Sequence, residues 1–287
     1  MQSALQRVKS VTQGYWRSER MPHVELRSTY QSRVGYGEHL HQTFSIGAIL
    51  EGRTLVRYRG QERLARTGEL VLIEADAAHS CNPLDGRERS YHMLYLDTHW
   101  CLQRLSALVG HSVNSLCCSH FSVSDSALFR RYLELVDVLM HSDEPPVWQL
   151  ALDAFIDPLM LCYCSPEPAS SERDIVRFIR HRLQENLPSP PTLAELAEDL
   201  RLRPETLIRA FYREAGMTPH AYLNSMRIEW AKSLLRQGES IADTAQAVGF
   251  SDQSHFHKRF VAATAATPGQ YLLERSIFDN PPSPGER

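Results

Sequence analysis

Three histidines and one polar helix face are the parts of this sequence best suited to chemistry. His39 and His41 are separated by one residue, and His79 follows in the stretch GELVLIEADAAHSCNP. Alternating residues of a β-strand point to the same side, so we expect His39 and His41 to face one side together. If that side is the interior of a barrel, His79 can meet them there. Such a cluster could bind zinc or iron with an open coordination position, hydrogen-bond a polar ligand, or fill the barrel mouth.

The polar helix face lies in residues 239–259, ESIADTAQAVGFSDQSHFHKR. Apolar residues at helical spacing predict a short helix, with Ser240 as its N-cap and Gly249 at its exit. Ser251 or Asp252 caps the next helix, where Phe256 and Phe260 are expected to point inward. The side chains left on the outer face can hydrogen-bond base edges and phosphates: Gln253, Ser254, His257 and Lys258, with Arg259 flanking. Two short helices around a turn, the second polar outside, are typical of a helix-turn-helix DNA reader.

The same pattern occurs a second time, upstream, in residues 192–222. Thr192 and Glu195 form a capping box, and Pro204 occupies a first-turn position in PETLIRAFYREAG. The stretch GMTPHAY after this copy parallels AATPGQY after the other. A repeated unit favours DNA binding over an accidental corner of two helices. The helix expected between them, PHAYLNSMRIEWAKSLLRQG, has a length that would separate the two units by roughly one DNA turn.

The rest of the chain predicts an α+β protein of two domains. Short β-type segments between Val24 and Asp97, separated by glycine turns, indicate a small barrel or jelly roll. Helical patterns follow, and the stripe from Leu128 to Leu139 is expected to pack on the barrel or on a second copy, which suggests a homodimer. The expected segments are an arm or edge strand at 1–22, a barrel at 23–100, helices at 101–165, a linker at 166–171, a helical domain at 172–275 and a tail at 276–287. Ser171 is expected to be the N-cap of the first helix after the linker.

Composition leaves this interpretation open and restricts the alternatives. The 287 residues suffice for two domains with their own cores. The formal net charge of −3 neither requires nor excludes a polyanionic partner, since a local patch matters more. No apolar run reaches membrane-spanning length, and the N-terminus lacks the apolar core of a signal peptide. We therefore expect a cytoplasmic protein without a membrane partner, with its six cysteines reduced.

Two known families share these motifs. Residues 38–97 resemble the cupin fold, and in particular the sensor domains of one family of bacterial regulators, with His39 and His41 matching the first motif and Gly68 with His79 the second. Residues 174–275 resemble the DNA-binding domain of the AraC/XylS family, through FYREAGMTPHAYL, MRIEWAKSLL and GFSDQSHF with its downstream Thr-Pro. Three departures stand out. The glutamate of the first cupin motif is absent, EADAAH lacks the usual proline and glycine, and VAATAA follows Phe260 where basic residues and a glycine are frequent.

The resemblance implies a transcription regulator that is not an enzyme and that takes promoter DNA, RNA polymerase and a small effector as partners, more often as an activator. By position, the base-facing candidates are Glu205, Ile208 and Arg209 in the first unit and Gln253, Ser254, His257 and Lys258 in the second. Candidates for the DNA backbone are Arg201, Arg203, Arg213 and Arg259. The effector would bind near His39, His41 and His79, and no cofactor is expected beyond a possible metal there. Two alternatives stay open: a metal-dependent cupin enzyme fused to a DNA reader, and an effector-independent regulator whose barrel serves assembly.

Overall fold

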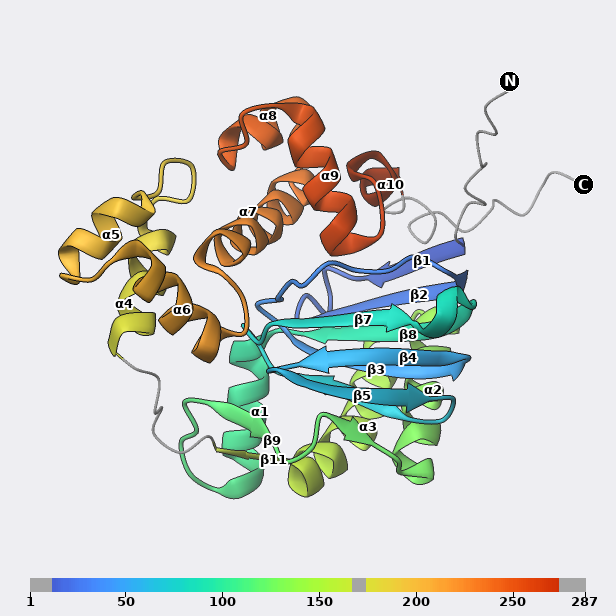
Figure 1. Ribbon diagram of the computed structural model, residues 1–287. Helices are drawn as coiled ribbons and strands as arrows, with labels where there is room; N and C mark the ends of the chain where they lie inside the picture. The colour runs from blue at the N-terminus through green and yellow to red at the C-terminus, as the bar shows by residue number, and fades with distance from the viewer. Residues whose placement is uncertain (1–11, 167–173, 274–287) are drawn as a thin grey trace, which may run out of the picture.

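The computed structural model describes residues 12–166 and 174–273, which form a β-rich N-terminal domain with helices and an all-helical C-terminal domain (Figure 1). The predicted α+β class is confirmed. We use "N-terminal domain" for residues 12–166 and "C-terminal domain" for residues 174–273. The Ser171 cap, most of the predicted linker, the first part of the predicted arm and the tail at 276–287 lie outside the described residues.

The strands of the N-terminal domain form two antiparallel sheets and one short pair. The six-stranded sheet has the order β1-β2-β8-β3-β6-β10, the three-stranded sheet has the order β5-β4-β7, and β9 pairs with β11. The strands are β1 (Thr12–Arg17), β2 (Val24–Ser32), β3 (Phe44–Glu51), β4 (Arg53–Tyr58), β5 (Gln61–Arg66), β6 (Leu70–Ile73), β7 (His79–Pro83), β8 (Arg89–Leu96), β9 (Leu116–Cys118), β10 (Ser122–Val123) and β11 (Cys164–Pro166). Within the predicted arm, β1 is an edge strand, and Pro166 ends a strand instead of starting a linker.

The two faces of the large sheet have different tasks because side chains alternate along each strand. Leu26, Leu94 and Ile46 stand in register across β2, β8 and β3, and all three belong to the core shared with the helices. The next row, Arg27, Met93 and Gly47, lies on the opposite face, toward the small sheet. One face therefore stabilises the domain, while the other is left for a pocket.

Three helices cover the apolar face: α1 (Thr98–Val109), α2 (Ser126–His141) and α3 (Pro145–Tyr163). The stripe from Leu128 to Leu139 is buried there, and the Tyr132 hydroxyl donates a hydrogen bond to the carbonyl of Ile46 at 3.1 Å. The prediction that this stripe forms a homodimer surface is therefore wrong. Amphipathic spacing identified the buried face of α2, but its partner is the sheet of the same chain.

The C-terminal domain consists of helices with two separate cores. Its helices are α4 (Asp174–Glu185), α5 (Leu193–Asp199), α6 (Pro204–Ala215), α7 (Pro219–Arg236), α8 (Ile241–Ala247), α9 (Gln253–Thr264) and α10 (Pro268–Leu273), and a short 3-10 turn, η1 (Leu84–Gly86), lies in the other domain. One core joins α5 and α6 to α4 and the first half of α7, and the other joins α8, α9 and α10 to its second half. Two helix-turn-helix units thus share α7 as their connection.

The predicted helix ends of these units are confirmed. Thr192 and Glu195 form the capping box of α5, and Ser240 caps α8. Asp252, not Ser251, caps α9 through the amide of His255. Gly249 has φ +90°, and a Cβ there would lie 2.6 Å from Pro188, so this turn requires glycine. Among the described residues, no helix has both the length and the apolar character needed to cross a bilayer.

Candidate effector pocket and DNA-reading helices

A cavity lies between the two sheets, at the end of the barrel that faces the C-terminal domain. The cavity has a volume of about 30 Å³. Most of the lining comes from β2, β3, β7, β8 and the segment before β3, and Ala263 of α9 closes it from the other domain. The cavity is lined by Arg27, Tyr36, His39, His41, Gly47, Ile49, Thr54, Val71, His79, Cys81, Arg89, Tyr91, Met93, Tyr95 and Ala263.

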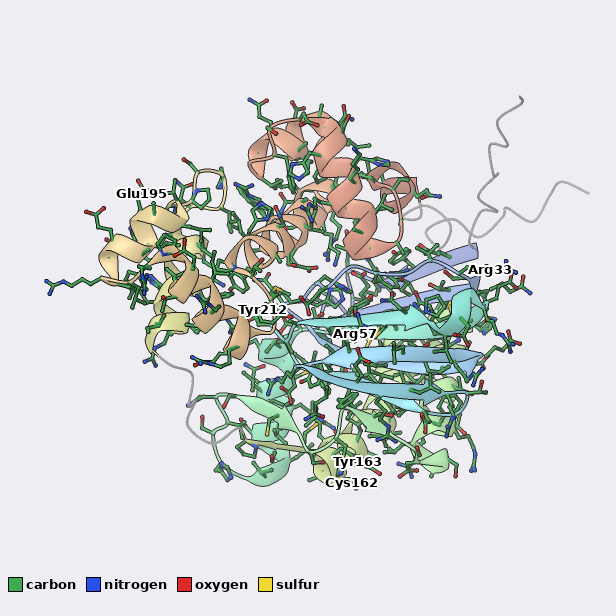
Figure 2. The ribbon with its side chains drawn as sticks, viewed as in Figure 1. Arg33, Arg57, Cys162, Tyr163, Glu195 and Tyr212 are labelled. Atoms are coloured by element: carbon green, nitrogen blue, oxygen red, sulfur yellow. The ribbon has the colours of Figure 1, made fainter. Side chains whose placement is uncertain are left out.

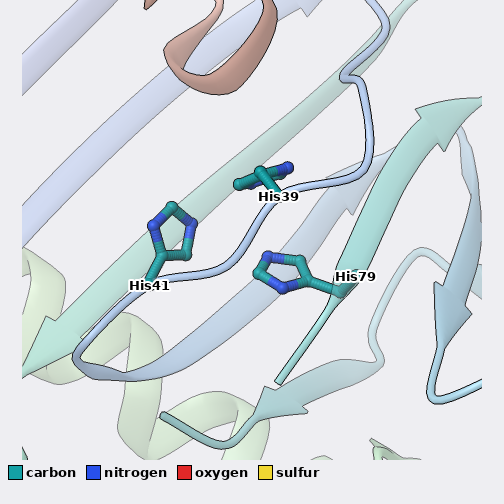
Figure 3. A group of neighbouring side chains, drawn as sticks. All are labelled: His39, His41 and His79. Carbon is teal, nitrogen blue, oxygen red and sulfur yellow. The ribbon is translucent and has the colours of Figure 1, made fainter. Parts of the chain in front are cut away.

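The three predicted histidines meet in this cavity. Figure 3 shows their rings gathered between the segment that carries His39 and His41 and the start of β7 at His79. The ring centroids are 4.4 Å apart for His39 and His79 and 4.8 Å apart for His39 and His41. The reason differs from the prediction, because His39 and His41 are not on a regular strand. His39 instead forms an isolated antiparallel bridge with His79, which draws the two segments together.

Hydrogen bonds fix the tautomer of each ring. Nδ1 of His39 donates to the carbonyl of Gly37 at 2.8 Å, and Nδ1 of His79 donates to that of Ala77 at 2.9 Å, since a carbonyl can only accept. Nδ1 of His41 lies 3.3 Å from a carboxylate oxygen of Glu229. Each Nε2 is then the nitrogen left to accept from a ligand or to bind a metal. One ring nitrogen of each histidine lies within 4.8 Å of one from each of the other two, so these three residues could hold a metal ion.

Burial keeps the rings neutral. Burial, together with the neighbouring His41, lowers the pKa of His79 to about 3. Burial also lowers the pKa of His39 well below its ordinary value, with His79 and His41 adding to the effect, and it lowers the pKa of His41 against the opposing influence of Glu229. At neutral pH the cluster therefore offers neutral acceptor nitrogens.

The fourth partner of the cluster comes from the other domain. Glu229 lies on α7, and its carboxylate contacts both His41 and, at 2.7 Å, the ammonium of Lys232. Burial opposes ionisation, but Lys232 and His41 outweigh it and lower the pKa of Glu229 to about 2. The first cupin motif lacks its glutamate, and the glutamate that contacts His41 instead is Glu229, 188 residues further along the chain. No local spacing could have identified it.

Two arginines and three tyrosines that line the pocket were not identified from the sequence. Arg27 and Arg89 are 4 % and 2 % exposed, and both guanidinium groups lie within 6.0 Å of the Tyr91 ring centre. Arg27 also contacts the hydroxyl of Tyr36, which in turn contacts that of Tyr91. The available signal was alternation: Arg27 occupies the face opposite Val24 and Leu26 in β2, and Arg89, Tyr91, Met93 and Tyr95 alternate along β8.

The domain boundary runs along the pocket. Leu40, between His39 and His41, packs into the core of the first helix-turn-helix unit, as does Ala78, which precedes His79. Tyr15 of β1 packs into the core of the second unit. The amide of Gly37 donates to the carbonyl of Ala262 at 3.1 Å, so the VAATAA segment that ends α9 rests on the barrel.

The predicted DNA-reading residues lie on the second helix of each unit. Arg209 and Glu205 are exposed on α6, whereas Ile208 is half-buried against the first core, which leaves less of it for a base. Gln253, Ser254, His257 and Lys258 are all exposed on the first two turns of α9. Arg201, Arg203, Arg213 and Arg259 are exposed beside them. Figure 2 shows Glu195, at the start of α5, on the side of this domain away from the barrel.

Comparisons with known proteins agree with this geometry. An AraC-like ligand-binding domain matches residues 22–156, and a helix-turn-helix domain matches residues 196–274. The chain is 28 % identical over 242 residues to the transcriptional regulator YbfI of Bacillus subtilis, covering 77 % of this chain and 81 % of YbfI. It is 25 % identical over 245 residues to the transcriptional activator RhaS of Pectobacterium carotovorum, covering 82 % and 87 % of the two chains.

The fold also matches a solved structure over nearly the whole chain. ToxT from Vibrio cholerae has a TM-score of 0.55 at 14 % identity, covering 93 % of this chain and 99 % of ToxT. The β-rich sensor followed by two helix-turn-helix units is thus a known arrangement. The chain belongs to the AraC family of helix-turn-helix transcriptional regulators and carries an AraC-like ligand-binding domain at its N-terminus.

Proposed function

We propose that this regulator changes its affinity for promoter DNA when a small effector binds among His39, His41 and His79. One observation carries the proposal. The two short segments that bring these histidines into the pocket also send Leu40 and Ala78 into the core of the first helix-turn-helix unit. Neighbouring side chains on an extended segment point to opposite sides, so a shift of the backbone that carries the histidines also shifts Leu40 and Ala78. A ligand that shifts the histidines therefore shifts the packing of α5 and α6 as well.

Two further contacts link the pocket to the second half of the C-terminal domain. Glu229 holds His41 from α7, and Ala263 of α9 is part of the pocket lining. Gly216 adds a close approach, since a Cβ there would lie 3.2 Å from that of Ala78. Packed interfaces of this kind respond to small shifts by changing between discrete arrangements. The effector would act by favouring one of these arrangements.

On DNA, we propose that α6 and α9 enter successive major grooves. Helix α7 has 18 residues and is therefore about 27 Å long, which suits units separated by roughly one DNA turn. Exposed Arg209, Gln253 and His257 can hydrogen-bond base edges, and Arg201, Arg203, Arg213 and Arg259 can contact phosphates. Because the end of α9 rests on the barrel, the second unit would rely on its first two turns to contact DNA.

The finer parts of the proposal concern partners. RhaS is described as an activator, and ToxT has been solved with an unsaturated fatty acid bound. Both support an effector-controlled activator. We further propose that it acts in the cytoplasm, as a homodimer, on direct-repeat sites beside RNA polymerase. Because the α2 stripe is buried within the chain, a dimer would have to use another surface. Sedimentation that finds only monomer at micromolar concentration would remove the dimer from the proposal.

The direct test is transcription in vitro with bacterial RNA polymerase. The template carries a DNA site selected by the full-length protein from a random library, and compounds are added one at a time. We expect the protein to raise transcript yield, and at least one compound to change that yield. A lowered yield would indicate a repressor. If every compound that binds the protein leaves both transcription and DNA affinity unchanged, the effector-independent alternative is supported instead.

A further inference from the structure

Two positive charges are buried in the pocket without a negative partner. Arg27 and Arg89 lie on β2 and β8 and are almost fully buried. Arg27 donates to the hydroxyls of Tyr36 and Tyr91, and Arg89 donates to the Thr54 hydroxyl and the Cys81 carbonyl. Nε of each side chain has no hydrogen-bond partner. Among the carboxylates of residues 12–166 and 174–273, none forms an ion pair with either guanidinium.

This arrangement is costly for a purely structural site. Moving a charge out of water is unfavourable unless an opposite charge and hydrogen bonds compensate, and buried arginines are accordingly almost always paired. Within residues 12–166 and 174–273, other buried or half-buried carboxylates follow the rule. Glu74 pairs with Arg59, Glu25 pairs with Arg17 at 2.9 Å, and Glu229 pairs with Lys232. The two pocket arginines are the exception, and they line an accessible cavity. Unsatisfied groups of this kind are characteristic of sites completed by a ligand.

Tyrosine ionisation does not remove the imbalance. Burial opposes ionisation of Tyr91, but Arg27 and Arg89 outweigh it and lower its pKa. Burial raises the pKa of Tyr36, so that phenol stays neutral. Even a fully ionised Tyr91 would balance only one of the two guanidinium charges. The cavity therefore retains at least one unmatched positive charge at neutral pH.

We propose that the effector of this regulator is a small organic carboxylate, whose acid group is held by Arg27 and Arg89 with the phenols of Tyr36 and Tyr91. This inference rests on the proposed function, since it names the chemical class of the molecule that the pocket would sense. A guanidinium offers a planar fork of donors that matches a carboxylate. The neutral Nε2 atoms of His39, His41 and His79 are acceptors and suit a hydroxyl or amide donor on the same molecule.

The rest of the lining favours a carboxylate over a free phosphate. Ile49, Val71 and Met93 present apolar side chains beside the arginines, and Gly47 lets the Met93 side chain lie close to β3, because a Cβ there would lie 3.2 Å from Met93. Such a surface fits a short carbon chain, which a free phosphate lacks. Ala263 of the other domain is part of the lining, so a ligand that fills this cavity would contact both domains.

The test measures ligand-induced thermal stabilisation and affinity on the full-length protein. The probes are mono-, di- and hydroxycarboxylates, each beside its neutral amide, with inorganic phosphate and neutral sugars as further arms. We expect at least one carboxylate to raise the melting temperature, and its amide to fail. Arg27→Met should weaken the affinity of that acid about ten- to a hundredfold, as loss of a charge-assisted pair does. Arg57→Gln, on the exposed side of the small sheet, is the matched control and should bind like wild type.

A second readout guards against simple misfolding. Because an unpaired buried charge is unfavourable, Arg27→Met without ligand should melt at the same temperature as wild type or higher. A lower melting temperature in that variant would mark Arg27 as structural and overturn the proposal. The proposal would also be overturned if phosphate, sugars or amides stabilised the protein as much as acids do. Loss of acid binding after chelation of metals would overturn it as well. If acids bind but DNA affinity never changes, the carboxylate site stands and the proposed regulation fails. If a neutral or cationic compound controls DNA binding, the proposed regulation stands and the carboxylate site fails.

Discussion

The Glu229 carboxylate of α7 accepts a hydrogen bond from Nδ1 of His41 at 3.3 Å, across the boundary between the sensor barrel and the DNA-binding domain. Lys232 contacts the same carboxylate, and Arg236, one turn further along α7, lies 3.6 Å from Glu25 of β2. Polar contacts therefore join one face of α7 to the barrel wall that carries the pocket. Because α7 connects both helix-turn-helix units, this contact joins the pocket to the helix that lies between them.

Replacing Glu229 with Gln should loosen this boundary. The variant keeps the size of the side chain but loses the charge that Lys232 and His41 contact, and charge-assisted hydrogen bonds contribute about 1.5–3 kcal/mol. Hydrogen exchange should therefore speed up several-fold at residues 36–41 and along the second half of α7. Glu239→Gln, an exposed position after the same helix, is the control. Unchanged exchange in Glu229→Gln would show that this contact does not hold the domains together.

Acidification should destabilise the pocket through its histidines. Burial lowers the pKa of His79 to about 3, whereas the unfolded chain titrates near 6.5. Between these values the unfolded state binds more protons, so the free energy of unfolding falls as pH drops, by up to about 1.4 kcal/mol per pH unit for each such group. Urea unfolding at pH 7 and pH 5 should show this fall, and His79→Gln should make it shallower. His120→Gln, at an exposed position, is the control and should show the same fall in stability between pH 7 and pH 5 as the wild type. If the wild type and both variants lost equal stability, His79 would not be the group responsible.

The buried stripe of α2 predicts a loss of stability, not of assembly. Leu135 is 1 % exposed in the core between the sheet and the helices, so Leu135→Ala should lower the free energy of unfolding by about 2–5 kcal/mol. Leu161→Ala, at a position 58 % exposed on α3, should change it far less. Chemical denaturation checks both values. If Leu135→Ala mainly changed the sedimentation of a folded protein, the stripe would be an assembly surface after all.

Arg209 is the sharpest test of base reading. Its side chain is exposed on α6, where Nε donates a long hydrogen bond, 3.4 Å, to the carbonyl of Glu205. Arg209→Ala should weaken specific binding by about 1–3 kcal/mol and relax preference at a single base position. Arg213→Ala should weaken binding on every sequence and reduce its salt dependence. Selection of DNA sites by each variant separates the two outcomes, and a uniform loss in Arg209→Ala would make it a phosphate contact.

Local features were predictable, and long-range ones were not. The capping box at Thr192 and the turn at Gly249 depend on residues a few positions apart, so their spacing identified both helix-turn-helix units. The histidine cluster was predicted for a partly wrong reason, since the bridge between His39 and His79 and not a common strand brings the rings together. Strand pairing places Arg27 beside Met93, and no pattern within β2 states that partner. Glu229 reaches His41 only through the docking of two domains.

The most direct test of the account is the affinity for DNA with and without a bound acid. Full-length protein is titrated onto its selected DNA site, first alone and then with a saturating amount of the carboxylate that stabilises it most. Coupling between two sites is typically about 1–3 kcal/mol, so the Kd for DNA should change at least about fivefold, and Arg27→Met should abolish the change. An identical Kd with and without the acid, at full occupancy of the pocket, would contradict it.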